Sequence, residues 1–429
     1  MRTVIALVVS LLAVSAAAQK LTLLHFSDYH SHALPFYSEG RDDQGGIARA
    51  IEYLEGEKKR GALVFSGGDM INKGSPAWSD KYTCAEWSWL NGIVDAMAFG
   101  NHDPDYGKEE FDRCRASVRY PILSANTSGM RPYVVFVRKG VRIGVFALAG
   151  ADFRQLVKVS AFTYADPVNA ARDVVRALRV TEHVDAVVMI GHEDYEDDLA
   201  LAHAVPGIDL IFGSHSHRKE ALTRIAGTKT WFISPFQYLT YISRVVLTFD
   251  DRKLVDVTGE LVRIDSNLRA DRTVASNVAR MQRELEADPQ YRDLFKVIAR
   301  LKAPLSVEEL GNKTVGMMRS LTNADVALST TSSFRQPLPG GPITAELLRA
   351  AMPYENEIVV AEMTGERLQQ LLDKASDVYV ARPTVIDASR TYRIATTDYV
   401  TGVEFREFFN DVQKTGMKVR GKLESHLEN

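Results

Sequence analysis

Short apolar runs alternate with amphipathic segments through the first half of the chain. Between Leu21 and about Phe249, the apolar runs are separated by segments such as residues 47–54 and 170–178, where apolar residues recur at helical spacing. This alternation of strand and helix patterns is typical of α/β proteins. We therefore predict an α/β domain over residues 19–265.

The pattern changes after this region. Residues 266–303 are charged and favour helix, most clearly at 277–287 and 292–301, so we expect a helical linker there. A second, smaller domain is expected over residues 304–429. Its first elements are predicted to be a strand at 324–328, a loop at 329–342 with a Pro-Gly-Gly-Pro break, and a helix at 344–351.

The N-terminus has the pattern of a secretory signal. Arg2 precedes an apolar stretch over residues 4–14, and small residues follow up to Ala18, before the polar Gln19. This stretch is too short to span a bilayer, although a buried N-terminal helix is the alternative. We expect residues 1–18 to be a signal peptide, and the mature protein to be secreted or periplasmic. The charged C-terminal segment, residues 419–429, predicts no membrane anchor there.

Composition and charge exclude several classes of protein. The chain has 429 residues, of which 45% are hydrophobic, and this usage excludes a disordered or collagen-like protein. A formal net charge of −3 argues against a partner that is a nucleic-acid polymer. Cys84 and Cys114 are the two cysteines. In an oxidising compartment they either pair or remain as two buried thiols, and the sequence leaves both possibilities open.

Five apolar runs each end in residues that can bind metal. Ligands of α/β proteins collect at the carboxyl ends of strands. A single aspartate there is usually a helix cap or turn residue, and a single histidine is usually a packing residue. Five such ends in one domain are hard to explain as caps. The oxygen and imidazole donors suit Zn, Mn, Fe or Co rather than a thiolate zinc site, and seven donors are enough for two ions that share a carboxylate. These donors are Asp28, His30, Asp69, Asn101, His192, His215 and His217.

These segments resemble the signature blocks of the calcineurin-like metallophosphoesterases, and within them the secreted 5′-nucleotidase group. The similarity is strong in the first domain and thinner in the second, where residues 353–356 and 364–366 carry it. The matching blocks of the first domain are Asp28-Tyr29-His30, Gly68-Asp69, Gly100-Asn101-His102-Asp103, Gly191-His192 and Gly213-Ser214-His215-Ser216-His217.

The resemblance implies a four-layer α/β/β/α sandwich followed by a smaller α/β substrate domain. It also implies two divalent ions bridged by Asp69. One ion would be held by Asp28, His30 and His217, and the other by Asn101, His192 and His215. His102 would act on the leaving group or the transition state, and Asp105 would orient it, unless Asp105 is only a loop carboxylate.

The substrate residues are less clearly matched. The resemblance implies that Arg335 binds the substrate phosphate, the alternative being a solvated loop cation. Phe405 and Tyr379 are candidates for stacking on a base, with core packing as the alternative for each. The second domain is trimmed relative to the family, which puts specificity for the nucleobase in doubt.

The expected activity is hydrolysis of nucleoside 5′-monophosphates or related nucleotides to nucleoside and phosphate by metal-activated water. One alternative is that the same centre acts on a nucleotide sugar, a cyclic nucleotide or a thiosulfonate, because specificity depends on contacts outside the metal site. A non-catalytic nucleotide-binding protein is the other alternative. The partner is therefore expected to be a small phosphate ester, and the oligomeric state is left open.

Overall fold

Two six-stranded sheets form the N-terminal part of the molecule. The computed structural model describes residues 18–157 and 159–427, so the predicted signal segment lies outside the described residues except for Ala18. In both sheets the central strands run parallel; the second sheet has an antiparallel strand at each edge, and the first has antiparallel strands at one edge only. The first sheet has the order β14 (Lys253–Arg263), β13 (Tyr241–Asp250), β1 (Gln19–Phe26), β4 (Leu63–Ser66), β5 (Ala96–Ala98) and β6 (Ile122–Leu123). The second has the order β11 (Lys219–Arg224), β12 (Trp231–Pro235), β10 (Leu210–Phe212), β9 (Ala186–Met189), β8 (Val141–Phe146) and β7 (Tyr133–Arg138).

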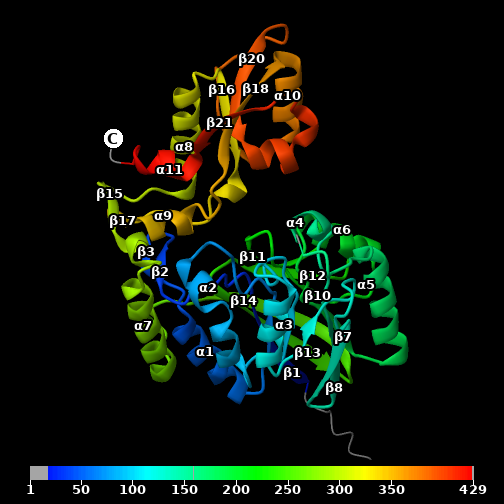
Figure 1. Ribbon diagram of the computed structural model, residues 1–429. Helices are drawn as coiled ribbons and strands as arrows, with labels where there is room; N and C mark the ends of the chain where they lie inside the picture. The colour runs from blue at the N-terminus through cyan, green and yellow to red at the C-terminus, as the bar shows by residue number, and fades with distance from the viewer. Residues whose placement is uncertain (1–17, 158, 428–429) are drawn as a thin grey trace, which may run out of the picture.

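The two sheets pack face to face and helices cover their outer faces. Leu23 and Phe65 of the first sheet share one buried cluster with Val188 and Phe212 of the second. The outer face of the first sheet packs against α1 (Ile47–Lys59), α2 (Ala77–Tyr82), α3 (Lys108–Ser117) and α7 (Arg272–Ala287). The outer face of the second packs against α5 (Pro167–Arg176) and α6 (Tyr195–Ala204). The predicted α/β/β/α sandwich is confirmed (Figure 1).

The C-terminal part is a single mixed sheet with helices on both sides. Its order is β19 (Val378–Ala381), β16 (Val326–Thr330), β20 (Thr391–Thr397), β18 (Glu357–Thr364) and β21 (Gln413–Lys418). One face packs against α8 (Val307–Thr322), α9 (Ala345–Ala351) and α11 (Val419–Glu424), and the other against α10 (Gly365–Lys374). The predicted strand at 324–328 and helix at 344–351 correspond to β16 and α9. In Figure 1 this domain sits beside the first, with α9 between them.

The expected helical linker is correct only in its first half. Helix α7 covers residues 272–287, as predicted. The helix expected over 292–301 is wrong, because a short 3₁₀ turn leads into the strand β15 (Val297–Leu301). This strand pairs antiparallel with β17 (Gly341–Thr344). Pairing with a distant segment overrides a weak local helix preference, and the branched side chains of Val297 and Ile298 suit a strand.

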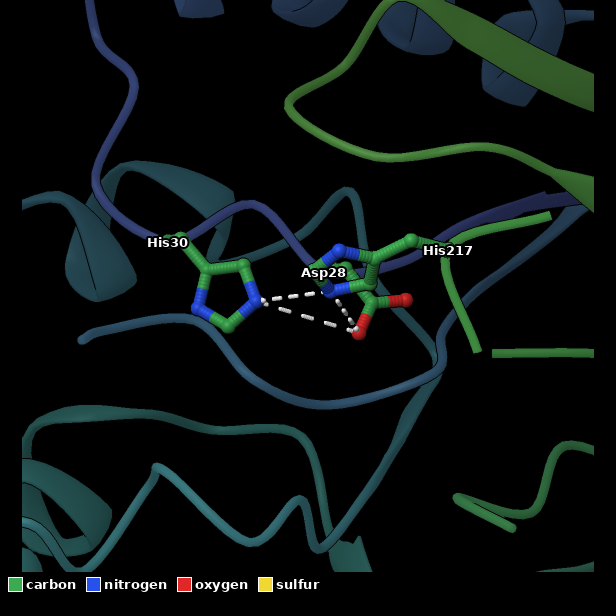
Figure 2. A group of neighbouring side chains, drawn as sticks. All are labelled: Asp28, His30 and His217. Atoms are coloured by element: carbon green, nitrogen blue, oxygen red, sulfur yellow. Dashed lines mark hydrogen bonds and ion pairs between the residues drawn. The ribbon is translucent and has the colours of Figure 1, made fainter. Parts of the chain in front are cut away.

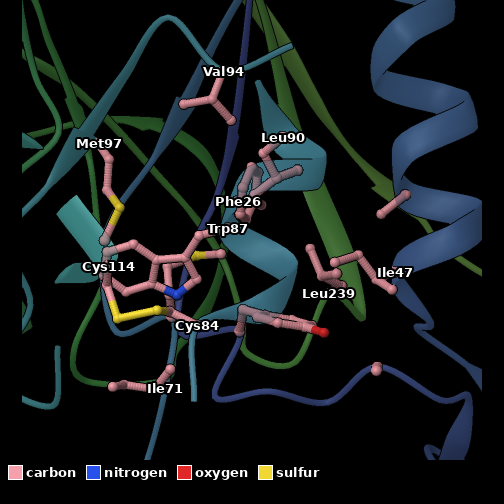
Figure 3. Close-up of a cluster of buried hydrophobic side chains, with 14 of the residues drawn as sticks. Phe26, Ile47, Ile71, Cys84, Trp87, Leu90, Val94, Met97, Cys114 and Leu239 are labelled. Atoms are coloured by element: carbon pink, nitrogen blue, oxygen red, sulfur yellow. A yellow bond between two sulfur atoms is a disulfide. The ribbon is translucent and has the colours of Figure 1, made fainter. Parts of the chain in front are cut away.

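The two cysteines form a disulfide. Cys84 is bonded to Cys114 of α3, and the bridge lies under the indole of Trp87 in the cluster that covers the first sheet (Figure 3). The choice that the sequence left open is therefore settled in favour of pairing. Over the described part of the chain, we find no helix with the length and apolar character needed to cross a membrane.

Candidate active site

The seven predicted metal-binding side chains converge at one edge of the sandwich. They follow the carboxyl ends of β1, β4 and β5 in the first sheet, and of β9 and β10 in the second. Five of them are buried, and those of His215 and His217 are 14% and 11% exposed. Because the sheets stack with these ends together, residues nearly 190 positions apart in the chain come into contact. The parallel arrangement thus assembles the cluster.

The backbone at these positions is strained. Asp28, His30, Asp69, His215 and His217 all have φ between 46° and 61°, in the left-handed region that non-glycine residues rarely adopt. Such strain collects at functional sites, where the surrounding structure has to hold it. The turn at Gly100 also has no room for a side chain. A Cβ on Gly100 would lie only 2.2 Å from Asp69 Oδ1, which explains why glycine precedes Asn101.

Asp28, His30 and His217 form the first group (Figure 2). His217 Nε2 lies 3.3 Å from Asp28 Oδ1 and 3.1 Å from His30 Nε2, and His30 Nε2 lies 3.9 Å from the same carboxylate oxygen. Asp28 and His30 lie in the loop after β1 and His217 in the loop after β10, and the three atoms face a common point (Figure 2). The group is one that could hold a metal ion.

Asp69, His192 and His215 form the second group, with Asn101 beside it. His192 Nε2 lies 3.2 Å from Asp69 Oδ2 and 3.1 Å from Asn101 Oδ1. The same Asp69 oxygen is 3.7 Å from His30 Nε2 of the first group. Asp69 therefore lies between the two groups, as its expected bridging role requires. Its other oxygen, Oδ1, accepts a hydrogen bond from the His102 backbone N–H at 2.8 Å.

The hydrogen bonds of two histidines leave lone pairs directed at these carboxylates. His30 Nδ1 donates to the Ile71 carbonyl at 3.1 Å, and His192 Nδ1 donates to the Gly67 carbonyl at 2.6 Å. With the proton on Nδ1, the Nε2 atom of each neutral ring is an acceptor. Acceptors that face carboxylate oxygens repel one another unless a cation lies among them. The donor set thus fits divalent metal ions.

The pKa values of His192 and Asp69 also indicate that the site favours positive charge. Burial alone would lower the pKa of His192, but the charges of Asp69 and Asp28 outweigh it and raise that pKa to about 10. For Asp69, burial would raise the pKa, but the histidines around it hold it well below its ordinary value. The site therefore attracts positive charge strongly, and its carboxylates stay ionised at neutral pH.

His102 and Asp105 form the expected dyad. His102 Nδ1 lies 2.8 Å from Asp105 Oδ2, and the same oxygen accepts the Lys73 backbone N–H at 3.0 Å. Burial would lower the pKa of His102, but the Asp105 carboxylate outweighs it and raises that pKa well above its ordinary value. Nε2, the other ring nitrogen, is left for a partner across the site.

Arg335 reaches the site from the second domain, whereas Phe405 and Tyr379 do not. Arg335 Nη1 is 2.7 Å from His217 Nδ1. Phe405 is 8% exposed and lies in the apolar cluster beneath α10, and Tyr379 packs its ring against Phe334. Phe405 thus packs in the core of the second domain, and Tyr379 packs half-buried against it.

Two residues at the site were not singled out from the sequence. Asp152 Oδ2 lies 3.1 Å from His215 Nε2, and Tyr354 Oη accepts from Arg335 Nη2 at 3.1 Å and lies 3.4 Å from His102 Nε2. Asp152 could have been found, because it follows Gly150 a few residues after the strand β8. Tyr354 stands in a block of the noted resemblance, but no local pattern indicates that its side chain reaches His102.

A cavity of ≈ 580 Å³ opens beside the dyad. Such a volume suits a small organic ligand. His102 and Asp105 form part of its wall, together with phenol rings and aliphatic side chains. The other wall residues include Lys73, Tyr106, Leu156, Val157, Val159 and Tyr354.

Comparison with known proteins identifies both parts of the chain. Residues 21–219 match the calcineurin-like phosphoesterase family, and residues 293–385 match the 5′-nucleotidase C-terminal domain. The chain belongs to the calcineurin-like phosphoesterases that carry a 5′-nucleotidase C-terminal domain. Members of this family are metal-dependent phosphoesterases, and the chain has residue groups able to hold divalent metals.

Relatives and solved structures of this family extend over both domains. Protein UshA of Yersinia enterocolitica is 23% identical over 88% of this chain and 84% of its own length. The fold is similar to that of a 5′-nucleotidase precursor from Thermus thermophilus, with a TM-score of 0.77, 21% identity and 96% coverage of both chains. It is nearly as similar to the sulfate thiohydrolase SoxB of the same organism, with a TM-score of 0.76, 18% identity, and coverage of 95% and 93%. The fold is therefore shared by enzymes whose names indicate different substrates.

Proposed function

We propose that this phosphoesterase releases phosphate from nucleoside 5′-monophosphates or related nucleotides. The observation that carries the proposal is the pair of donor groups that share Asp69 and lie next to the His102–Asp105 dyad. Family membership supports phosphoester hydrolysis, and the names of the relatives support a nucleotide substrate.

Two divalent ions, of Zn, Mn, Fe or Co, would occupy the two groups. Asp28, His30 and His217 would hold one, and Asn101, His192 and His215 the other, with Asp69 shared. Bound there, the ions would activate a water molecule for in-line attack and neutralise charge on the phosphoryl oxygens. The carboxylates and imidazoles of the chain fix the separation of the two positions.

His102 would serve the leaving group. Asp105 holds Nδ1, so Nε2 is the nitrogen that faces the cavity. A positioned imidazole in this setting donates a proton to the departing ester oxygen, which typically contributes about 10²–10⁴-fold to the rate. The nucleoside would occupy the cavity between Tyr106 and Tyr354.

Arg335 would bind the phosphate. Its present partner, His217 Nδ1, must accept from the guanidinium, because arginine has only donors. When His217 Nε2 binds a cation, Nδ1 carries the proton and can no longer accept. Arg335 then needs another acceptor, and a phosphoryl oxygen beside the metal groups is a suitable one.

A substrate other than a nucleoside monophosphate is the alternative proposal. Phe405 packs in the core and Tyr379 packs half-buried against it, so neither ring supports stacking on a base. The same centre would then act on another small ester or on a sulfur-linked substrate, as the fold similarity to a sulfate thiohydrolase illustrates. Clear turnover of a thiosulfonate without turnover of nucleotides would favour this reading.

Phosphate release by the purified protein tests the proposal. Nucleoside monophosphates and p-nitrophenyl phosphate are assayed for phosphate, and nucleotide sugars and cyclic nucleotides for their phosphomonoester products, each with Mn²⁺ or Zn²⁺ and with a chelator. We expect a preference for the monophosphates, loss of activity with chelator, and no activity in Asp69→Ala. Full activity of Asp69→Ala contradicts the metal assignment, and nucleotide binding without turnover indicates a binding protein instead.

We also propose that the protein acts outside the cytosol. The signal-like N-terminus and the Cys84–Cys114 disulfide support this location, because disulfides persist in oxidising compartments. N-terminal sequencing of the exported protein should begin at Gln19. Retention of Met1 in a cytosolic product contradicts the proposal.

A further inference from the structure

Tyr354 joins the second domain to the dyad of the first. Its hydroxyl accepts from Arg335 Nη2 at 3.1 Å and lies 3.4 Å from His102 Nε2. The Arg335 guanidinium also lies 5.7 Å from the centre of the Tyr354 ring. The contact with Tyr354 uses Nη2, whereas the contact with His217 uses Nη1, so one can persist when the other is lost.

The hydrogen bonds that link Arg335 to Asp105 through Tyr354 and His102 have a fixed order of donors and acceptors. Arg335 only donates, so the Tyr354 oxygen accepts from it and keeps its own proton for another partner. His102 Nδ1 donates to Asp105, which leaves Nε2 as the nitrogen that meets the phenol. At 3.4 Å this last hydrogen bond is long, and such bonds often tighten when substrate binds.

A hydroxyl suits this position because it can both donate and accept. When His102 is neutral, Nε2 accepts the phenolic proton. When His102 is protonated, Nε2–H faces the phenolic oxygen and the leaving group together. Phenylalanine would fill the same space and satisfy neither state.

Arg420 of α11 holds the backbone of the loop that carries Tyr354. Arg420 Nη1 donates to the Met352 carbonyl at 2.9 Å and to the Pro353 carbonyl at 3.2 Å. These two carbonyls immediately precede Tyr354 in the chain. The backbone that leads into Tyr354 is therefore held by Arg420 of α11.

Helix α9 fixes the same loop to the first domain. The Ala77 backbone N–H donates to Glu346 Oε1 at 2.6 Å, and Ser75 Oγ donates to the Arg349 carbonyl at 3.0 Å. Lys73, two residues before Ser75 in the same first-domain loop, donates its backbone N–H to Asp105. The contacts between domains thus place Tyr354 against the same segment that positions the dyad.

We propose that the Tyr354 hydroxyl is a positioning group that aligns His102 Nε2 with the leaving-group oxygen. The inference rests on the proposed phosphoesterase function. In that reaction the water oxygen forms a bond to phosphorus and loses a proton to solvent, the ester P–O bond breaks, and the ester oxygen takes the proton from His102 Nε2, which solvent then restores. An imidazole held only at Nδ1 can tilt about its Cβ–Cγ bond. A second contact at Nε2 removes that freedom, and a misplacement of about 1 Å can cost on the order of 10²-fold in rate.

Tyr354→Phe tests the proposal with two leaving groups. For a nucleoside 5′-monophosphate, whose alkoxide needs protonation, we expect kcat to fall by roughly 10–100-fold with KM nearly unchanged. For p-nitrophenyl phosphate, whose phenolate departs without a proton, the loss should stay below about threefold. Bound metal, measured by elemental analysis, should be unchanged. Tyr379→Phe, a matched removal of a hydroxyl from a half-buried ring of the same domain, should leave both rates unchanged.

A second variant decides whether Tyr354 acts through His102. In a His102→Gln background, adding Tyr354→Phe should cause no further loss, because the group it aligns is gone. An undiminished extra loss overturns the proposal, as does an equal loss on the two esters or no loss on either. A wild-type protein that hydrolyses neither ester defeats the proposed function itself, and this inference with it.

Discussion

Replacing Asp152 by alanine should weaken the binding of one metal ion and leave the other. Asp152 Oδ2 lies 3.1 Å from His215 Nε2, and a carboxylate at that distance requires a proton on the nitrogen. The lone pair of His215 is then on Nδ1, which is the nitrogen left for the group that contains Asp69 and His192. Burial would raise the pKa of Asp152, but the hydrogen bond and charge of His215 lower it, so the carboxylate is ionised at neutral pH.

The expected size of the effect follows from the exposure of this contact. Loss of a carboxylate that orients a ligating histidine typically costs about 10–100-fold in metal affinity. The Asp152 side chain is 32% exposed, so water can partly replace it. We therefore expect the lower end of that range, about tenfold, or about 1.4 kcal/mol.

Competition with a zinc-binding dye measures the two affinities separately. The apoprotein should take up two equivalents, and Asp152→Ala should shift only the one held by the group that contains His215. Asp194→Asn is the matched control, because Asp194 Oδ1 is 3.8 Å from the same nitrogen and 55% exposed. Its affinities should change by less than about twofold. Unchanged binding in Asp152→Ala, or an equal change in the control, would refute the reasoning.

Three further changes have defined outcomes. His102→Ala should lower kcat by about 10²–10⁴-fold while elemental analysis shows unchanged metal content, and loss of metal would contradict its assigned role. Replacing Cys84 and Cys114 together by serine should cost about 3–4 kcal/mol in urea unfolding, since the bridge closes a loop with a sequence separation of 30. Burial raises the pKa of Glu86 to about 7, so its protonated form stabilises the fold. That stability is present below about pH 4.5 and is lost as pH rises toward 7. The Tm of Glu86→Gln should fall less over this range, and parallel Tm curves would contradict the prediction.

The convergence of the candidate metal-binding residues was predictable because most of them follow a local pattern. A buried strand, a glycine turn and a polar side chain follow one another in the sequence, as at Asp69 and Asn101. Because the carboxyl ends of parallel strands lie at the same edge of a sheet, the fold brings these turns together. The four-layer fold itself was predicted from the family resemblance.

What the sequence missed or left open concerns contacts between distant segments. Strand β15 forms because residues 341–344 pair with it, which no local preference indicates. The pairing of Cys84 with Cys114 depends on how α3 packs against the preceding loop. Phe405 was considered for stacking on a base, yet its ring packs beneath α10, since aromatic side chains serve cores and sites equally well.

The proposed site takes side chains from both domains. The metal groups and the dyad belong to one domain, whereas Arg335 and Tyr354 come from the other and reach the site only through contacts between domains. On the first-domain side, the cavity beside His102 is walled by aliphatic residues such as Leu156 and Val157, and Tyr354 closes it on the other. A leaving group would therefore meet surfaces from both domains, and the proposed phosphate contacts likewise come from the metal groups of the first domain and from Arg335 of the second. We therefore expect changes in the second domain to affect both which ester is cleaved, through the cavity wall, and how fast it is cleaved, through Arg335 and Tyr354.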